Sequence, residues 1–213
     1  MKAGVDAYKT LGSAACGDVV INKSRFIGHG APAHTEEEAL AFLQAKRVEY
    51  KDASHNCFAY IIGKNAGIQR YSDDGEPGGT AGLPIIHVMQ AQKVVDAVVV
   101  VTRYFGGILL GAGGLVRAYT QGAVLALEAA QVVTMHPTHT YLLVVDYQRW
   151  GKLENFLAAQ PIRVLSTEYG TDISVTLEVK QEDADALLYG IAGATDGRAE
   201  ALLVAEDYAG WKE

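Results

Sequence analysis

Glycine is concentrated in one part of this 213-residue chain, and this concentration is the strongest constraint on how the chain can fold. Eleven of the 23 glycines lie between Gly67 and Gly122. The two densest stretches are YSDDGEPGGTAGLP (Tyr71–Pro84) and TRYFGGILLGAGGLVRAYTQG (Thr102–Gly122). Because glycine loses much conformational freedom on folding, so many are kept only where the backbone turns tightly or closely approaches another group. We therefore expect the two segments to meet in space and form one recognition surface with partial positive character.

The charge distribution predicts two domains. Residues 1–135 hold 12 basic residues (Lys and Arg) and 12 acidic residues (Asp and Glu), so their charges cancel. Residues 136–213 hold 6 basic and 13 acidic residues and carry the whole net charge of −7. The apolar content of 49% is that of a globular protein and excludes a disordered chain. We expect a domain over residues 1–135 and an acidic one over residues 136–213. The acidic domain should repel phosphate backbones and is a candidate surface for a protein partner.

Three features predict a cytoplasmic protein without a membrane partner. The longest strongly apolar run, Ala97–Val101, is far shorter than a membrane span. The first ten residues, MKAGVDAYKT, lack the apolar core of a signal peptide. The two cysteines, Cys16 and Cys57, form no CxxC pair and suit a reducing compartment.

The hydrophobic pattern of the first domain predicts a sheet with helices. The expected strands are Gly17–Lys23, Arg25–Ala33, Asn56–Gly63, Ile68–Ser72 and Ala97–Arg103, and the expected helices begin at Thr35, Gly82 and Gly113. Thr35 and Glu38 form a capping box for the first helix. Ala97–Arg103 is a nearly continuous β-branched run, which is typical of a strand covered on both faces. The last helix, Gly113–Val133, has one apolar stripe and one polar stripe.

The second domain is predicted to be a ferredoxin-like βαββαβ unit. It should begin after Met135-His136-Pro137, where proline prevents the preceding helix from continuing. The expected order is strand Thr140–Tyr147, helix Arg149–Ala159, strands Ile162–Glu168 and Thr171–Lys180, helix Glu182–Ala192 and strand Arg198–Asp207.

The acidic loop places Asp73, Asp74 and Glu76 within four residues. Oxygen ligands of this kind suit a divalent cation such as magnesium or calcium, and a pair of carboxylates suits acid–base chemistry. The alternative is structural: Asp and Gly shape the turns, and Thr80 caps the helix that follows. A pairing of the loop with Arg103 across a cleft would also make the carboxylates structural. Apart from this possible divalent cation, we expect no cofactor.

The second glycine-rich segment allows two interpretations. Gly106, Gly107, Gly111, Gly113 and Gly114 immediately precede or open a helix, whose free N–H groups would provide an anion site. The segment has neither the Gly-Lys-Ser/Thr ending of a P-loop nor a GxGxxG pattern. Glycine also allows close packing of a helix against a strand, so a phosphate cradle and tight packing remain alternatives.

Basic and aromatic residues lie at the ends of the elements around this loop. Arg103 and Tyr104 end the buried strand, Arg117 follows one turn into the helix, and Arg70 and Tyr71 end an earlier strand. Together they would form a platform that binds phosphate and stacks on bases. The alternative is that each makes only local hydrogen bonds.

No residue pattern indicates a catalytic centre. His55, before the strand Asn56–Gly63, is a candidate base or ligand, although a lone histidine is more often a structural hydrogen bonder. Cys57 lies in an apolar strand and is expected to be a packed thiol. We therefore expect a binding protein rather than an enzyme.

Four motifs resemble the YigZ/IMPACT family, in particular its bacterial YigZ branch. They are KSRFIG (Lys23–Gly28), SHNCFAYIIG (Ser54–Gly63), SDDGEPGGTAGLP (Ser72–Pro84) and VVVTRYFGGILLGAGGLVRAYT (Val98–Thr120). The resemblance implies an α+β fold with a left-handed βαβ first domain similar to domain IV of elongation factor G and to the GHMP kinases. It implies a second domain similar to domain V of the same factor. It transfers no catalytic role to any residue.

The resemblance also implies a role in translation. The family is suspected of binding RNA or ribosomes, and its eukaryotic relatives regulate translation during amino-acid starvation by competing for a protein partner. The leading hypothesis is a non-enzymatic protein that contacts RNA or the ribosome through the glycine and arginine face of the first domain. The alternative is a phosphate-ligand binder or enzyme that uses Asp73, Asp74 and Glu76 with a divalent metal.

Overall fold

The structure is a computed structural model that describes residues 7–211. The chain divides into two compact units, and residues 8–134 form one while residues 135–211 form the core of the other. Each unit combines an antiparallel sheet with helices, so the fold class is α+β with two domains, as the sequence predicts. Within the described residues, no helix is both long and apolar enough to span a bilayer.

The N-terminal unit is built on a five-stranded antiparallel sheet in the order β2-β3-β6-β4-β5. The strands are β2 (Ala15–Ile21), β3 (Ser24–Pro32), β4 (His55–Ile62), β5 (Ile68–Ser72) and β6 (Ala97–Tyr104). The central strand β6 pairs with β3 on one side and β4 on the other. All residues from Ala97 to Arg103 are buried, which confirms the strand covered on both faces.

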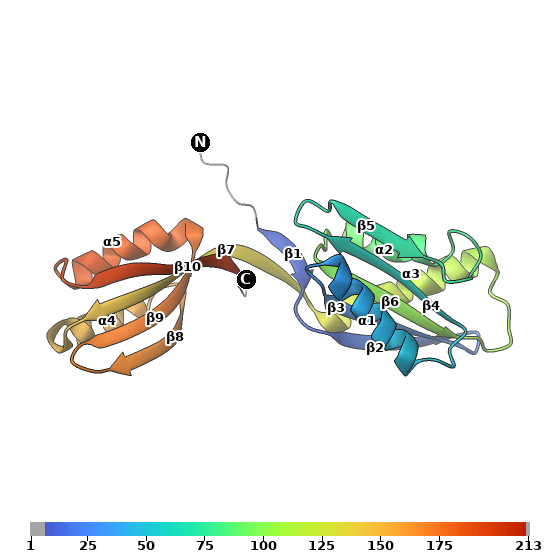
Figure 1. Cartoon of the computed structure of the whole chain (residues 1–213), viewed down its shortest axis with the longest axis horizontal. Helices are drawn as coiled ribbons and strands as arrows, with labels where there is room; N and C mark the ends of the chain where they lie inside the picture. The colour runs from blue at the N-terminus through green and yellow to red at the C-terminus, as the bar shows by residue number, and fades with distance from the viewer. Residues whose placement is uncertain (1–6, 212–213) are drawn as a thin grey trace. The chain divides into compact units, whose positions relative to one another are not determined.

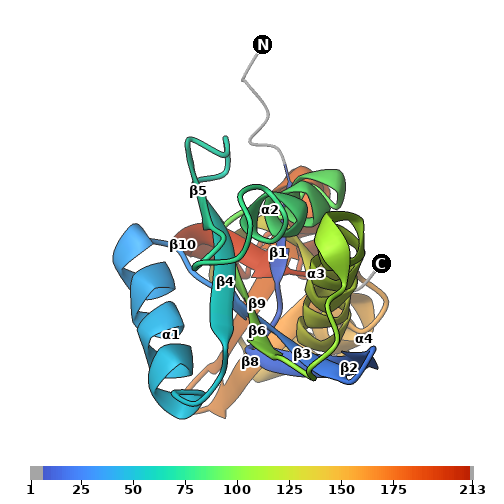
Figure 2. The same cartoon turned by 90° about the vertical axis from the view of Figure 1, so that its right-hand side faces the viewer.

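Helices cover both faces of this sheet (Figure 2). Helix α1 (Glu36–Glu49) packs on the face that presents Val98 and Val100. Helices α2 (Gly82–Ala91) and α3 (Gly111–Ala130) pack on the opposite face. The predicted cap of α1 is present, since the Glu38 N–H donates to Thr35 Oγ1, and the apolar stripe of α3 is buried as expected.

The structure differs from the sequence prediction at both ends of this unit. Strand β1 (Tyr8–Leu11) was not expected, and α3 ends at Ala130 rather than Val133. The segment Met135-His136-Pro137, after which the second domain was expected to begin, lies within the long strand β7 (Val132–Val145). Pro137 is paired in register with Tyr208 of β10, whereas the pairing of β7 with β9 begins only at Thr138, so the proline lies before the β9 ladder.

The C-terminal unit has the predicted βαββαβ order, visible in Figure 1. Its elements after β7 are α4 (Tyr147–Leu157), β8 (Ile162–Tyr169), β9 (Ile173–Lys180), a short 3₁₀ helix η1 (Gln181–Asp183), α5 (Ala184–Ala194) and β10 (Glu200–Gly210). Strands β10, β7, β9 and β8 pair antiparallel in that order, and β1 also pairs with β7 in this five-stranded sheet. Alternate residues of β9 are buried against α4 and α5, as the alternation in the sequence predicts.

A buried histidine makes the stability of the N-terminal unit depend on pH. Burial, followed by the charge of Lys46, lowers the pKa of His29 from 6.5 to about 4. As the pH falls from 6.5 towards 4, the unfolded chain takes up this proton while the folded protein does not, so the free energy of unfolding should fall by up to about 3 kcal/mol. Urea titrations of His29→Phe between pH 7 and 4.5 should show a shallower decrease than the parent, and equal slopes would contradict the assignment.

Candidate functional site

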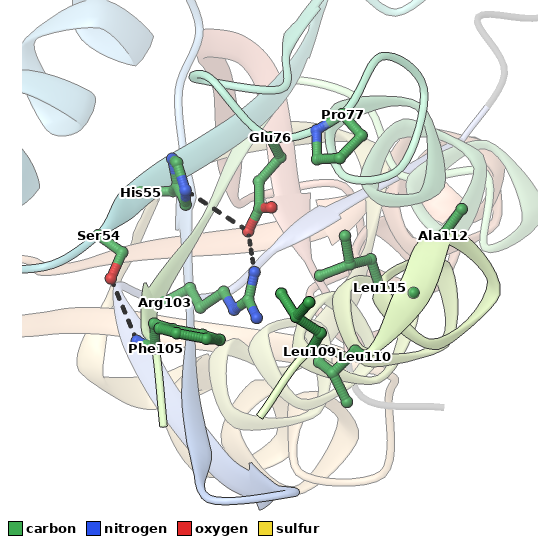
Figure 3. Close-up of a pocket in the computed structure, with 11 residues that line it drawn as sticks. Ser54, His55, Glu76, Pro77, Arg103, Phe105, Leu109, Leu110, Ala112 and Leu115 are labelled. Atoms are coloured by element: carbon green, nitrogen blue, oxygen red, sulfur yellow. Dashed lines mark hydrogen bonds and ion pairs between the residues drawn. The ribbon is translucent and has the colours of Figure 1, made fainter. Parts of the chain in front are cut away.

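The two glycine-rich segments meet at a cavity of about 490 Å³ in the N-terminal unit (Figure 3). Glu76 and Pro77 of the first segment face Arg103, Phe105 and the start of α3 from the second. The polar lining residues are Ser54, His55, Glu76 and Arg103, and the larger apolar ones are Pro77, Phe105, Leu109, Leu110 and Leu115. The expected meeting of the two segments is therefore found, although most of the lining is apolar.

A buried ion pair joins the two segments at this cavity. Arg103 Nη1 lies 2.6 Å from Glu76 Oε1, and both side chains are less than a tenth exposed. The same carboxylate oxygen accepts a hydrogen bond of 2.7 Å from the Tyr119 hydroxyl of α3. The guanidinium carbon lies 5.4 Å from the ring centroids of both Phe26 and Phe105. Arg103 is thus held by charge and by two aromatic rings, and its positive charge is neutralised by Glu76.

Asp73 organises the backbone of the acidic loop. Its carboxylate accepts hydrogen bonds from the N–H groups of Gly79, Ala81 and Gly82 at 2.8–3.0 Å. Burial opposes ionisation, but these three hydrogen bonds outweigh it and lower the pKa of Asp73. Asp73 therefore caps the start of α2, a role that the structural interpretation of the sequence assigned to Thr80. That prediction is wrong, since the Thr80 hydroxyl donates to the Pro77 carbonyl instead.

Asp74 connects the acidic loop to β4 and α1. Its Oδ1 accepts a hydrogen bond from Arg47 and its Oδ2 accepts one from the Asn56 N–H. Its backbone oxygen lies 2.7 Å from His55 Nδ1, which must donate because a carbonyl oxygen only accepts. In neutral His55 the other nitrogen, Nε2, is then an acceptor, and it lies 3.9 Å from Glu76 Oε1.

The three carboxylates of the acidic loop thus have different protein partners. Over residues 7–211 the structure contains no group of three or more His, Cys, Asp or Glu side chains placed to hold a metal ion. Cys57 is buried as predicted, and its thiol donates to the Asp73 carbonyl. Burial raises the pKa of this thiol, so it is a packed donor rather than a nucleophile.

The glycines of the second segment serve two different purposes. A Cβ atom at Gly106 would come within 2.1 Å of the Lys23 backbone, so this glycine allows close packing. A Cβ atom at Gly107, Gly111 or Gly113 would meet nothing within 4 Å. The backbone at Gly107 and Gly111 has positive φ values of 82° and 68°. Tight packing therefore explains Gly106, while the glycines at the start of α3 leave its backbone accessible. Gly114 lies against the Leu110 side chain.

The basic and aromatic residues do not assemble into the predicted platform. Arg70 is paired in register with Tyr60, which packs on the α1 side of the sheet, whereas Arg103 is paired with Phe26 on the other side. Tyr104 donates a hydrogen bond to Asp52. Tyr71 is exposed on β5, and Arg117 is exposed on α3. Only Arg103 of the five residues lines the cavity.

Sequence reasoning missed several residues of the site. Ser54, Phe105 and Leu109 line the cavity but belong to no polar motif. An available signal was the exposed apolar run Phe105–Leu110, since Phe105 is 48% and Leu109 86% exposed beside the glycines. Tyr119 belongs to the apolar stripe of α3, and the hydrogen bond from its hydroxyl to Glu76 could not be inferred from that pattern.

These observations define a two-domain α+β protein whose first domain holds a loop-lined cavity over a buried ion pair. The Impact N-terminal domain matches residues 22–127, and a domain of unknown function (DUF1949) matches residues 143–198. The IMPACT family member YvyE of Bacillus subtilis is 38% identical over 194 residues, which cover 91% of this chain and 89% of that protein. The chain belongs to the IMPACT family.

Other relatives cover different parts of the chain. The family member YigZ of Escherichia coli is 38% identical over 151 residues, or 70% of this chain and 74% of that protein. Protein IMPACT of Mus musculus is 40% identical over 95 residues, which are 42% of this chain and 29% of the mouse protein. A solved structure described as a crystal structure of a hypothetical protein has a TM-score of 0.60 and 30% identity, and covers 95% of this chain and 100% of that one.

The buried ion pair should dominate the stability of the site. Glu76→Gln leaves the Arg103 cation buried without a counter-charge, and the free energy of unfolding should fall by about 3–5 kcal/mol. Asp18→Asn breaks the exposed pair between Arg25 and Asp18 and should leave the free energy of unfolding almost unchanged, because solvent screens this pair. Urea denaturation measures both variants. Similar small losses in the two would show that the Glu76 pair does not hold the loops together.

Proposed function

We propose that this protein is a non-enzymatic binding protein with a regulatory role linked to translation, and that the cavity face of its N-terminal unit contacts RNA or the ribosome. The cavity face comprises the rim formed by Phe105–Gly114 together with Lys23 and Arg117. The resemblance of the four motifs to a family suspected of binding ribosomes supports this role, and so does membership of the family that includes the protein IMPACT of vertebrates.

The observation that carries the proposal is the combination of an exposed ring with an open helix end. Phe105 is about half exposed and stacks over the Arg103 guanidinium, so its outer face is free to stack on a base. Beside it, α3 begins at Gly111 without a side-chain cap and without an acid in its first turn. Free N–H groups at such an end bind phosphate oxygens.

Two exposed cations belong to segments next to this ring and helix end. The Lys23 backbone lies against Gly106, and Arg117 lies on the second turn of α3. Within residues 7–211 neither side chain forms an ion pair or a hydrogen bond, so both are available to phosphate. Arg103 contributes to this surface by supporting Phe105, because its guanidinium is buried and paired with Glu76.

A metal-assisted reaction on a phosphate ligand is less well supported. Asp73, Asp74 and Glu76 already accept hydrogen bonds from backbone N–H groups, arginines and a tyrosine. A divalent ion would have to displace these partners before it could be held. The acidic loop is therefore better explained as the frame of the cavity face.

The proposal is tested by salt-dependent binding to ribosomes and to structured RNA. We expect Lys23→Glu/Arg117→Glu to weaken binding at least tenfold at 50 mM salt, because two phosphate contacts become repulsive. The slope of log K against log salt should also fall by about two.

Arg70→Glu is the matched control, because it reverses the same charge on the opposite face of the sheet. It should retain affinity within about twofold at that salt concentration. Absence of any salt-sensitive affinity in the parent protein, or an equal loss in the control, would contradict the proposal.

A further inference from the structure

The cavity is more apolar than contact with a phosphate backbone requires. Its volume of about 490 Å³ is in the range of small-molecule sites, roughly 300–1,000 Å³. Apolar side chains form most of its wall, among them Leu109, Leu110 and Leu115. The polar residues Ser54, His55, Glu76 and Arg103 make up the rest of the lining. Such a lining suits a ligand with an apolar body and one polar end.

Arg103 has hydrogen-bonding capacity that the protein does not use. Its side chain is more than nine-tenths buried, and its only hydrogen bond within residues 7–211 is from Nη1 to Glu76. Its Nε has no partner in the same described part of the chain. Figure 3 shows the guanidinium among the lining residues, between Glu76 and Leu109. A buried charged donor without a partner is costly, so this arrangement favours a ligand that supplies an acceptor.

The start of α3 provides a second source of donors at the same cavity. Gly111 and Ala112, the first residues of this 20-residue helix, both line the cavity. Leu110 gives the helix no side-chain cap, and its first turn contains no acid. The unpaired N–H groups and the helix dipole therefore place positive potential at the cavity wall. Among the described residues that line the cavity, Glu76 is the one acid.

The charges of the wall distinguish between possible anions. Glu76 lies in the same wall as Arg103, so a dianionic phosphate would meet a second negative charge close by. A monoanionic carboxylate has half that charge, and its planar shape matches the edge of a guanidinium.

We propose that this cavity binds a monocarboxylate with an apolar body, whose carboxylate meets Arg103 and the start of α3 while its body packs on Leu109, Leu110 and Leu115. Such a group is supplied by a free small acid or by the C-terminal residue of a polypeptide. The proposal goes beyond binding of RNA. The two proposals share the start of α3, but carboxylate binding does not use Lys23 or Arg117, so Lys23→Glu/Arg117→Glu tests RNA binding separately.

The test uses 3-phenylpropionate as a probe and isothermal titration calorimetry of the full chain. We expect saturable binding of 3-phenylpropionate. The affinity for 3-phenylpropionamide should be at least tenfold lower because the amide lacks the charge, and the affinity for phenyl phosphate should also be lower than that for the carboxylate. No binding of 3-phenylpropionate, or equal binding of the amide, would overturn the proposal.

Gly113 offers a variant that separates binding from folding. It lies in the first turn of α3, and a Cβ atom there meets nothing within 4 Å. Gly113→Asp places a carboxylate at the helix end. It should therefore raise the melting temperature and weaken the binding of 3-phenylpropionate at least fivefold. Gly113→Asn has nearly the same shape without the charge and should bind within twofold of the parent. Equal affinities for the Asp and Asn variants would overturn the role of α3.

Two further arms distinguish the sources of the carboxylate. A tetrapeptide that ends in phenylalanine with a free carboxylate is compared with the same peptide as a C-terminal amide. Binding of 3-phenylpropionate and of the free peptide, but not of the peptide amide, supports a polypeptide C-terminus. Binding of 3-phenylpropionate without either peptide supports a free acid. Binding of both peptides with equal affinity would overturn the proposal, because the carboxylate would then contribute nothing.

Discussion

The contact between Glu76 and Arg103 connects the acidic loop to the end of β6, two segments that are separated in the sequence by helix α2. Their side chains are buried and lie 2.6 Å apart, and Tyr119 of α3 donates to the same carboxylate oxygen. The acidic loop, the end of β6 and the helix α3 are therefore fixed to one another at a single point. A buried charge pair is costly to break from one side, because the remaining charge has no other partner.

The glycines and the other acids shape the backbone around the contact between Glu76 and Arg103. Asp73 and Asp74 accept hydrogen bonds that hold the acidic loop in the shape that presents Glu76. Gly106 allows the chain after β6 to pass against Lys23, while the glycines at the start of α3 leave the backbone open. A fixed floor beneath an accessible rim is the arrangement expected of a binding site on a rigid scaffold.

Much of the fold could be predicted from the sequence because periodicity and β-branching report burial directly. The run Ala97–Arg103 became the central strand, and the alternation in Ile173–Lys180 became a half-buried strand. Strand β1 was missed because four residues carry too little pattern, and Pro137 was misread because its tolerance depends on where a neighbouring strand begins to pair.

The site was predictable only in part, since the motifs located the two segments but not their contacts. The meeting of the segments was expected, and a pairing of the acidic loop with Arg103 was one of the alternatives. The face of the sheet on which a side chain lies depends on strand register, so Arg70 was placed wrongly beside Arg103. Capping of α2 by Asp73 spans eight residues or more, beyond the reach of local capping rules.

Amide hydrogen exchange in Glu76→Gln tests most directly whether this one contact couples the two segments. The account predicts that protection falls together in residues 72–82 and in residues 105–114, while the C-terminal unit is unchanged. Faster exchange confined to residues 72–82 would show that the second segment holds its shape without the ion pair, and would contradict the account.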